Sequence, residues 1–154
     1  MLIEVGYKDG IFDAIGEGVK KDVDDFGARG IRAVRSLQIY RITGKITSAE
    51  LDFISSQILS DPITQHVSLV RASKKEKGAH FIEIWYKRGV TDTVGESVRK
   101  AIEDVGIRGV ESITTGKKFI FESTVTDKQL SDIAVKLLAN TLVEDHYINE
   151  NPRI

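Results

Sequence analysis

The sequence predicts an α+β protein built from two tandem β-α-β-β-α-β units. Each unit is expected to form an antiparallel sheet with its helices on one face, and the two units to form a pseudo-dimer within the chain. Two observations predict this. Residues 1–70 recur at residues 80–149 with a constant offset of 79, and both copies show the same order of strand-like and helix-like segments. We expect a first unit at 1–72, a linker at 73–79 and a second unit at 80–154.

The repeat holds one register from end to end. Eighteen of about 70 aligned positions are identical, more than chance similarity would keep without a gap. The segment 73–79 between the copies is charged and small, which is typical of a solvated connector. The identical pairs include Glu4 and Glu83, Asp13 and Asp92, Gly16 and Gly95, Gly27 and Gly106, Arg29 and Arg108, and Thr47 and Thr126.

Each copy opens with a strand followed by a helix. Residues 2–8 and 81–87 alternate between apolar and other side chains, which predicts strands. Asp13 and Asp92 suit the N-cap position, and Gly27 and Gly106 are expected to end the helices. Between them, apolar residues at spacings of four, four and three predict one buried stripe. These residues are Ile15, Val19, Val23 and Phe26 in the first copy, and Val94, Val98, Ile102 and Val105 in the second.

The middle of each copy is rich in β-forming residues. In the second copy it divides into Val110–Thr114 and Lys118–Ser123 around Gly116-Lys117, which predicts a hairpin. The first copy has Leu37-Gln38 at the turn, a weaker signal.

A second helix is expected in each copy, with Thr47 or Thr126 as its cap. Its apolar stripe predicts a buried face, and a last strand should follow at about 63–70 and 142–149. The stripes are Leu51, Ile54 and Ile58, and Leu130, Ile133 and Leu137.

The strand 81–87 carries Phe81 and Trp85 on the face opposite Ile82 and Ile84. Helices cover only one face of such a sheet, and large aromatic side chains are worth burying. We therefore expect the two units to associate sheet to sheet.

Composition excludes several classes of function. The chain has no cysteine, so disulfides and thiolate metal sites are excluded, and its net charge of −1 gives no general attraction to nucleic acid or anionic membranes. No apolar run approaches the roughly 20 residues of a membrane helix, and no signal-peptide pattern opens the chain. A cytoplasmic location is the default expectation.

The search for catalytic residues finds no catalytic, cofactor or metal site. Glu144 and His146 share a strand face, but a solvated strand of mixed charge explains them better than a metal site. Phe119 and Phe121 lie on a strand where RNA-recognition domains stack bases, yet the flanking basic and glycine residues are absent. No nucleic-acid partner is expected.

Arg29 and Arg108 are the best-matched polar twins, each just before a glycine. They are either paired contacts for an anion or partner, or charges that complement the helix C-termini. The second reading is favoured.

The second copy resembles the PurS family, the small subunit of phosphoribosylformylglycinamidine synthase. Residues 137–146 read Leu-Leu-Ala-Asn-Thr-Leu-Val-Glu-Asp-His, and the family typically ends in Leu-Leu-Ala-Asn-Pro-Val-Ile-Glu-Asp-Tyr. Gly116-Lys117 and the strand after it resemble the family's Gly-Lys-x-apolar-x-apolar-Glu. The first copy is a fainter match, with Gln65 where the second has Glu144. Because the usual PurS chain holds one unit and pairs as a dimer, this chain resembles a fused dimer.

This resemblance implies a function. The synthase makes an amidine from formylglycinamide ribonucleotide, glutamine and ATP. PurS-like subunits bridge the large synthetase subunit and the glutaminase subunit, support ammonia transfer and carry no catalytic residues or cofactor. The candidate partner-interface residues are the repeated arginines Arg29 and Arg108 together with Lys117, Asn140 and Glu144 of the motifs that resemble the family. The resemblance leaves open whether two such chains pair further.

Two other hypotheses remain. Tandem units of this topology often bind small molecules between the copies, which would make the chain a ligand-sensing module. An acylphosphatase-type enzyme shares the topology but needs an arginine after the first strand, where only Arg88 stands, in the second copy.

Overall fold

The computed structural model describes residues 1–152. Its strands form one antiparallel sheet in the order β3-β1-β2-β5-β4-β6, and the second helix of each copy continues into a π-helical turn. In the first copy the elements are β1 (Leu2–Tyr7), α1 (Ala14–Asp25), β2 (Ile31–Gly44), α2 (Ser48–Phe53), η1 (Ile54–Ile58) and β3 (Gln65–Val70). In the second they are β4 (Ala79–Tyr86), α3 (Thr93–Asp104), β5 (Val110–Ser123), α4 (Asp127–Ile133), η2 (Ala134–Leu138) and β6 (Glu144–Ile148).

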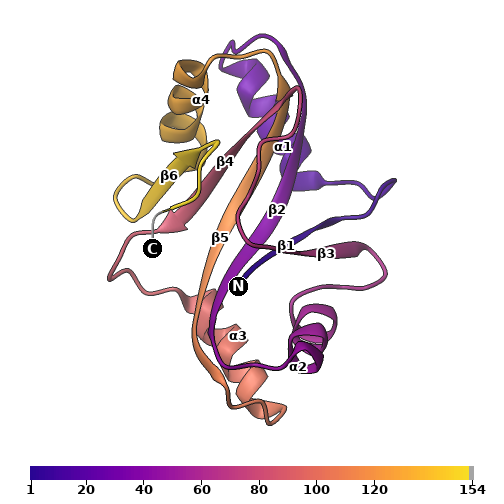
Figure 1. The fold of residues 1–154 in the computed structure, drawn as a ribbon. Coiled ribbons are helices and arrows are strands. Elements are labelled where there is room, and N and C mark those ends of the chain that lie inside the picture. Colours follow the sequence, from indigo (N-terminus) through magenta and orange to yellow (C-terminus); the bar gives the residue numbers. More distant parts are fainter. Residues whose placement is uncertain (153–154) are drawn as a thin grey trace. The chain divides into compact units, whose positions relative to one another are not determined.

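The predicted hairpin is wrong. β5 is a single strand of 14 residues, and Gly116-Lys117 lies inside it; β2 is likewise a single strand of 14 residues that passes through Leu37-Gln38. Figure 1 shows these two long strands side by side. The segment expected to fold back as a hairpin is therefore extended in each copy. The resulting long strand lies next to the long strand of the other copy.

Packing divides the chain into two compact units that each draw on both copies. Unit 1 contains Met1–Ile11, Gln38–Arg71 and Thr91–Gly116, and unit 2 contains Phe12–Leu37, Ala72–Val90 and the chain from Lys117 onward. Helix α1 of the first copy thus belongs to unit 2, and helix α3 of the second copy belongs to unit 1. The sequence repeats and the compact units are different divisions of the same chain.

The core of unit 2 combines α1 with strands and a helix of the second copy. Val23 of α1 is fully buried and packs in one cluster with Ile82 and Ile84 of β4, Phe121 of β5 and Ile133 of α4. Helix α1 also contacts η2. The apolar faces of α1 and α4 are therefore buried against each other and against one face of the sheet.

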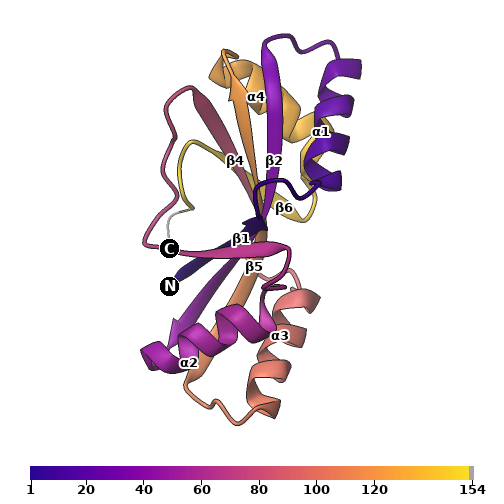
Figure 2. The same cartoon turned by 90° about the vertical axis from the view of Figure 1, so that its right-hand side faces the viewer.

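The core of unit 1 is built in the same way. Ile102 of α3 is fully buried and packs with Ile3 and Val5 of β1, Ile42 of β2 and Ile54 at the end of α2. Figure 2 shows α3 next to α2, and α3 contacts η1. Each unit is thus a β-α-β-β-α-β arrangement whose first helix and one strand half come from the other copy.

The copies join where strand β2 of the first copy lies next to strand β5 of the second, in the middle of the sheet. The outer pairings lie within a copy, since β1 pairs with β3 and β4 pairs with β6, both antiparallel. In unit 1 the pairing of β2 with β5 brings the Thr43 and Ser112 hydroxyls to 2.6 Å. The expected sheet-to-sheet association is therefore corrected to an association within one sheet, because the long strands pair edge to edge.

The predicted helix ends are confirmed. Asp13 and Asp92 are the N-caps and each accepts a hydrogen bond at 2.8 Å, from the backbone N–H of Gly16 and of Gly95 respectively. Gly27 and Gly106 follow the C-caps, and each has a φ of +90°, which favours glycine. Thr47 and Thr126 begin the second helices as complete capping boxes, with Glu50 and Gln129 as their partners.

The predicted stripe of the first helices is only half right. Val23 and Ile102 are fully buried, but Ile15, Phe26, Val94 and Val105 at the ends are exposed. Gly16 and Gly95 are buried in their place, because the helix lies directly against the long strand. A Cβ on Gly16 would stand 2.5 Å from the carbonyl oxygen of Val34.

The expected burial of Phe81 and Trp85 is confirmed, at 2% and 5% exposure. Phe81 packs with Ala79, Ile120 and Leu37, and the Lys118 ammonium lies 4.7 Å from its ring centroid. On the same strand face Glu83 is fully buried, and its Oε2 accepts a hydrogen bond from the Trp85 indole N–H at 2.9 Å.

Candidate functional site

Within residues 1–152, no group of three or more acidic or histidine side chains is placed to hold a metal ion. Glu144 is instead engaged locally, since its Oε2 accepts the backbone N–H of Asn140 at 2.8 Å. Phe119 and Phe121 are buried in the core of unit 2, so they offer no surface for base stacking. Arg88 lies exposed in the turn after β4. No helix in the described part of the chain is both long and apolar enough to cross a bilayer.

The sequence-predicted candidates Asn140 and Glu144 are brought together in one loop. Besides the contact from Asn140 N–H to Glu144, the Asn140 side-chain oxygen accepts the N–H of Leu142 at 3.2 Å, and the Asn140 carbonyl accepts from Val143 and Glu144. The loop before β6 is thereby closed on itself by side-chain and backbone hydrogen bonds. Asn140 and Glu144 set the shape of this loop.

The first copy closes the equivalent loop with different residues. The side-chain oxygen of Gln65 accepts the N–H of Asp61 at 2.8 Å, and the Asp61 carboxylate accepts the N–H of Ile63 at 2.9 Å and the Thr64 hydroxyl at 3.1 Å. Gln65 thus does in the first copy what Glu144 does in the second. Both loops therefore keep the same backbone hydrogen bonds and the same side-chain closure despite the difference in sequence.

An apolar side chain stands at the tip of each loop. Ile63 is 80% exposed and Leu142, its equivalent in the repeat, is 85% exposed. A single exposed aliphatic residue is ordinary, but two at matching positions on two hydrogen-bonded loops form a repeated surface feature. We call Ile63 and Leu142 the loop tips. Sequence analysis missed them, although both lie inside the repeat.

The other candidates lie on exposed surface. Arg29 lies in unit 2 between α1 and β2, Arg108 lies in unit 1 between α3 and β5, and Lys117 is exposed on β5 in unit 2.

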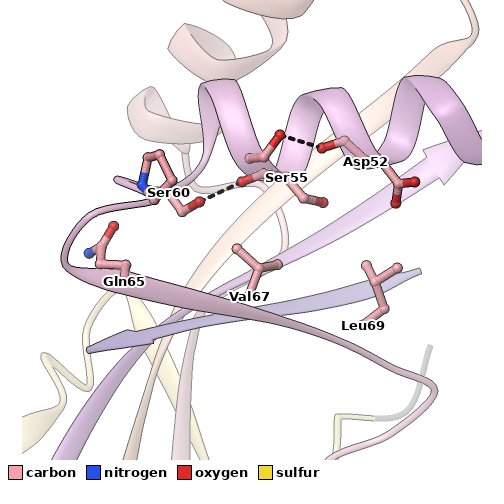
Figure 3. Close-up of a pocket in the computed structure, with 8 residues that line it drawn as sticks. Asp52, Ser55, Ser60, Gln65, Val67 and Leu69 are labelled. Atoms are coloured by element: carbon pink, nitrogen blue, oxygen red, sulfur yellow. Dashed lines mark hydrogen bonds between the residues drawn. The ribbon is translucent and has the colours of Figure 1, made fainter. Parts of the chain in front are cut away.

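A pocket of about 400 Å³ lies in unit 1, between the α2–η1 helix and the edge strand β3. Figure 3 shows Asp52, Ser55 and Ser60 along the helix facing Leu69, Val67 and Gln65 along the strand. Residues 65, 67 and 69 share one face of β3 because side chains alternate along a strand. The pocket is lined by Asp52, Ser55, Ser56, Ser60, Pro62, Gln65, Val67 and Leu69.

The wall of this pocket contains a buried hydroxyl without a partner. Ser55 is 7% exposed, and its Oγ has no hydrogen-bond partner among the described residues. A buried polar atom left unpaired costs about 1–3 kcal/mol. Nearby, the π-helical turn leaves the Ser55 carbonyl to accept the Ser60 hydroxyl at 2.7 Å, while the Leu59 N–H reaches the Ile54 carbonyl at 3.0 Å.

The hydroxyls belong to the first copy alone. At the repeat offset of 79, Ser55, Ser56 and Ser60 correspond to Ala134, Val135 and Ala139, and Asp52 corresponds to Ser131. Both copies nevertheless continue this helix into a π-helical turn, which begins one repeat position later in the second copy, at Ala134. The sequence signal for the pocket was therefore present as a difference between the copies in an otherwise shared helix.

Tyr40 and His80, which lie outside these sites, have displaced pKa values. Burial, and then the nearby Asp92 carboxylate, raise the pKa of the Tyr40 hydroxyl. Burial, and then the Lys75 ammonium, lower the pKa of His80, against an opposing effect of Asp127. The His80 Nδ1 also lies 2.9 Å from the Asn149 side-chain nitrogen. Burial in the folded chain is the largest cause of both pKa shifts.

The exchange of helices and the repeated loops define a fused pair of small α+β units. Comparison with known proteins identifies the family to which the chain belongs. The chain belongs to the PurS family: the family model described as phosphoribosylformylglycinamidine (FGAM) synthase matches residues 1–72 and again residues 80–151. The phosphoribosylformylglycinamidine synthase subunit PurS of Mycobacterium leprae is 33% identical over 66 residues, which is 42% of this chain and 84% of that protein. The tandem duplication and the family resemblance of the sequence motifs are thereby confirmed.

Proposed function

We propose that this chain is the PurS-type subunit of FGAM synthase in purine biosynthesis. In this role it is a non-catalytic adaptor that bridges the large synthetase subunit and the glutaminase subunit and supports ammonia transfer between them. The observation that carries the proposal is the double family match, which covers residues 1–72 and 80–151. The curated relative is itself named as a subunit of that synthase.

The exchanged architecture supports reading the chain as a fused dimer. Ile102 of the second copy completes the core of unit 1, and Val23 of the first copy completes the core of unit 2. A single copy therefore lacks a helix that its own strands need. Joining the copies in one chain supplies both partners at high effective concentration.

The loop tips are our proposed partner contacts. Ile63 and Leu142 are the most exposed large apolar side chains in the described part of the chain, and burying one in an apolar socket is worth about 1.5–3 kcal/mol. Asn140 and Glu144 act in this proposal as positioning residues that hold Leu142 in place. Arg29, Arg108 and Lys117 remain candidates for charged contacts at the rim of an interface.

Size-exclusion chromatography with the large and glutaminase subunits of the same organism tests this proposal. We expect a ternary complex that weakens at least tenfold when Leu142→Ser is introduced, because the socket then loses its apolar occupant. Leu69→Ser is the matched control, since it also removes an exposed leucine but lies on β3. If the wild-type chain binds neither subunit, the adaptor role is wrong. If Leu142→Ser and Ile63→Ser both bind like wild type, the loop tips are not the contacts.

A further inference from the structure

The pocket between the α2–η1 helix and β3 has no place in the adaptor role. It lies within the first copy, and its most buried polar group, the Ser55 hydroxyl, has no partner among the described residues. Figure 3 shows this hydroxyl directed toward the space above Val67. An unpaired buried hydroxyl is unfavourable for folding, and alanine at the equivalent position 134 supports the same helix. The stability of the helix therefore does not account for a serine at position 55.

The charged side chains around the pocket indicate the charge that a ligand would carry. Asp52 places a carboxylate at one end, and the lining residues include no lysine, arginine or histidine. The Lys8 ammonium is engaged elsewhere, since it donates to the carbonyl of the lining residue Pro62. A cationic group is thus favoured beside Asp52, and an anion has no counter-charge there.

The remaining walls define the rest of the ligand. Val67 and Leu69 offer an apolar surface opposite the helix, which suits a short aliphatic chain. Asp52 and Ser55 are three residues apart on one helix face, so their Cβ atoms are about 5–6 Å apart. Three or four carbons between a cation at Asp52 and a polar group at Ser55 would span that separation.

We propose that this pocket binds a small primary amine that also carries a neutral hydroxyl or amide group. The ammonium pairs with the Asp52 carboxylate, the aliphatic chain lies on Val67 and Leu69, and the neutral group exchanges hydrogen bonds with the Ser55 hydroxyl. The Gln65 side-chain NH₂ can donate to a longer ligand, because its oxygen already accepts from Asp61. The second copy lacks the carboxylate and the hydroxyl at the matching positions, so the site belongs to the first copy. This inference is independent of the adaptor role.

Titration of the full chain with 4-amino-1-butanol or 4-aminobutanamide, followed by amide NMR shifts, tests the site. We expect saturable shifts confined to residues 52–69, at millimolar concentrations because the pocket is open to solvent. 4-Hydroxybutyrate, which replaces the cation with an anion, should bind at least fivefold more weakly. So should 1-butylamine, which lacks the neutral polar group.

Variants separate the site from nonspecific binding. Ser55→Ala and Asp52→Asn should each weaken binding at least fivefold while keeping the spectrum of the folded chain. Asp132→Asn makes the same charge change on α4 of the second copy and should leave binding unchanged. The proposal is overturned if neither amine gives saturable shifts in residues 52–69, if 4-hydroxybutyrate binds as tightly, or if Ser55→Ala binds like wild type.

Discussion

Asp92 holds Thr115 by two hydrogen bonds, from the Thr115 N–H at 2.6 Å and from its hydroxyl at 2.8 Å. The same carboxylate caps helix α3, so one side chain ties the start of the helix to the long strand β5 within unit 1. Asp13 makes the same set of contacts to Gly16 and Ser36 in unit 2. This repeated contact fixes where each exchanged helix begins on its strand.

Asp92→Ala should therefore destabilise the chain by about 2–3 kcal/mol, because it removes a helix cap and two hydrogen bonds to a carboxylate. Urea unfolding followed by circular dichroism measures the loss. Asp92→Asn keeps an accepting oxygen and should cost less. A loss below about 0.5 kcal/mol for Asp92→Ala would show that the contact adds little.

Gly16→Ala should also destabilise, although alanine is the better helix former. Its Cβ would stand 2.5 Å from the Val34 carbonyl oxygen, so the helix would have to move off the strand. Gly18→Ala on the same helix is the matched control, because nothing lies within 4 Å of its Cβ. The control should stabilise by up to about 1 kcal/mol. Opposite signs in the two unfolding free energies are the expected result, and equal signs would contradict the close approach.

Acid should weaken the fold through His80. Its pKa is lowered in the folded state, by burial and then by the Lys75 ammonium. The unfolded chain, with a histidine pKa near about 6.5, therefore binds more protons, so stability falls as pH drops through that value toward the lowered folded pKa. His80→Asn should flatten the unfolding free energy between about pH 7.5 and 5. A slope identical to wild type would remove His80 as its source.

The second copy alone should not fold as a monomer. Residues 80–154 contain α3 but not β1 and the α2–η1 helix, against which Ile102 of α3 is buried. Light scattering on the isolated fragment should find a dimer that exchanges α3, or an unfolded chain. A folded monomer with native-like unfolding would mean that the hairpin closes locally and that exchange is not required.

Much of this architecture could be predicted from the sequence. Asp13, Asp92, Gly27 and Gly106 carry local signals that hold in any tertiary context, and the repeat revealed two equivalent copies. The prediction of a hairpin was wrong because Gly116-Lys117 can adopt either a tight turn or an extended strand, and in the structure it is extended within β5. Closed and exchanged forms bury the same kinds of residues in the same kind of unit, so local patterns do not choose between them.

The candidate site was less predictable. The motif that resembles the family points to Asn140 and Glu144. Their hydrogen bonds make them supports for the tip residue Leu142, to which no motif points. The pocket depends on how β3 lies against η1, which is a tertiary relationship. The sequence shows only that Ser55 aligns with Ala134. This difference indicates a site only together with the burial of the Ser55 hydroxyl, which the structure shows.

The rate of glutamine-dependent FGAM synthesis, measured with fixed large and glutaminase subunits while this chain is added, tests the central claim most directly. A PurS-type adaptor should raise the rate to a plateau at one defined stoichiometry, and the isolated copy 80–154 should not replace the full chain at equal concentration. The ammonia-dependent rate of the large subunit reports its own catalytic competence and serves as the control. A glutamine-dependent rate that is the same with and without the chain, while the ternary mixture is otherwise active, would contradict the account.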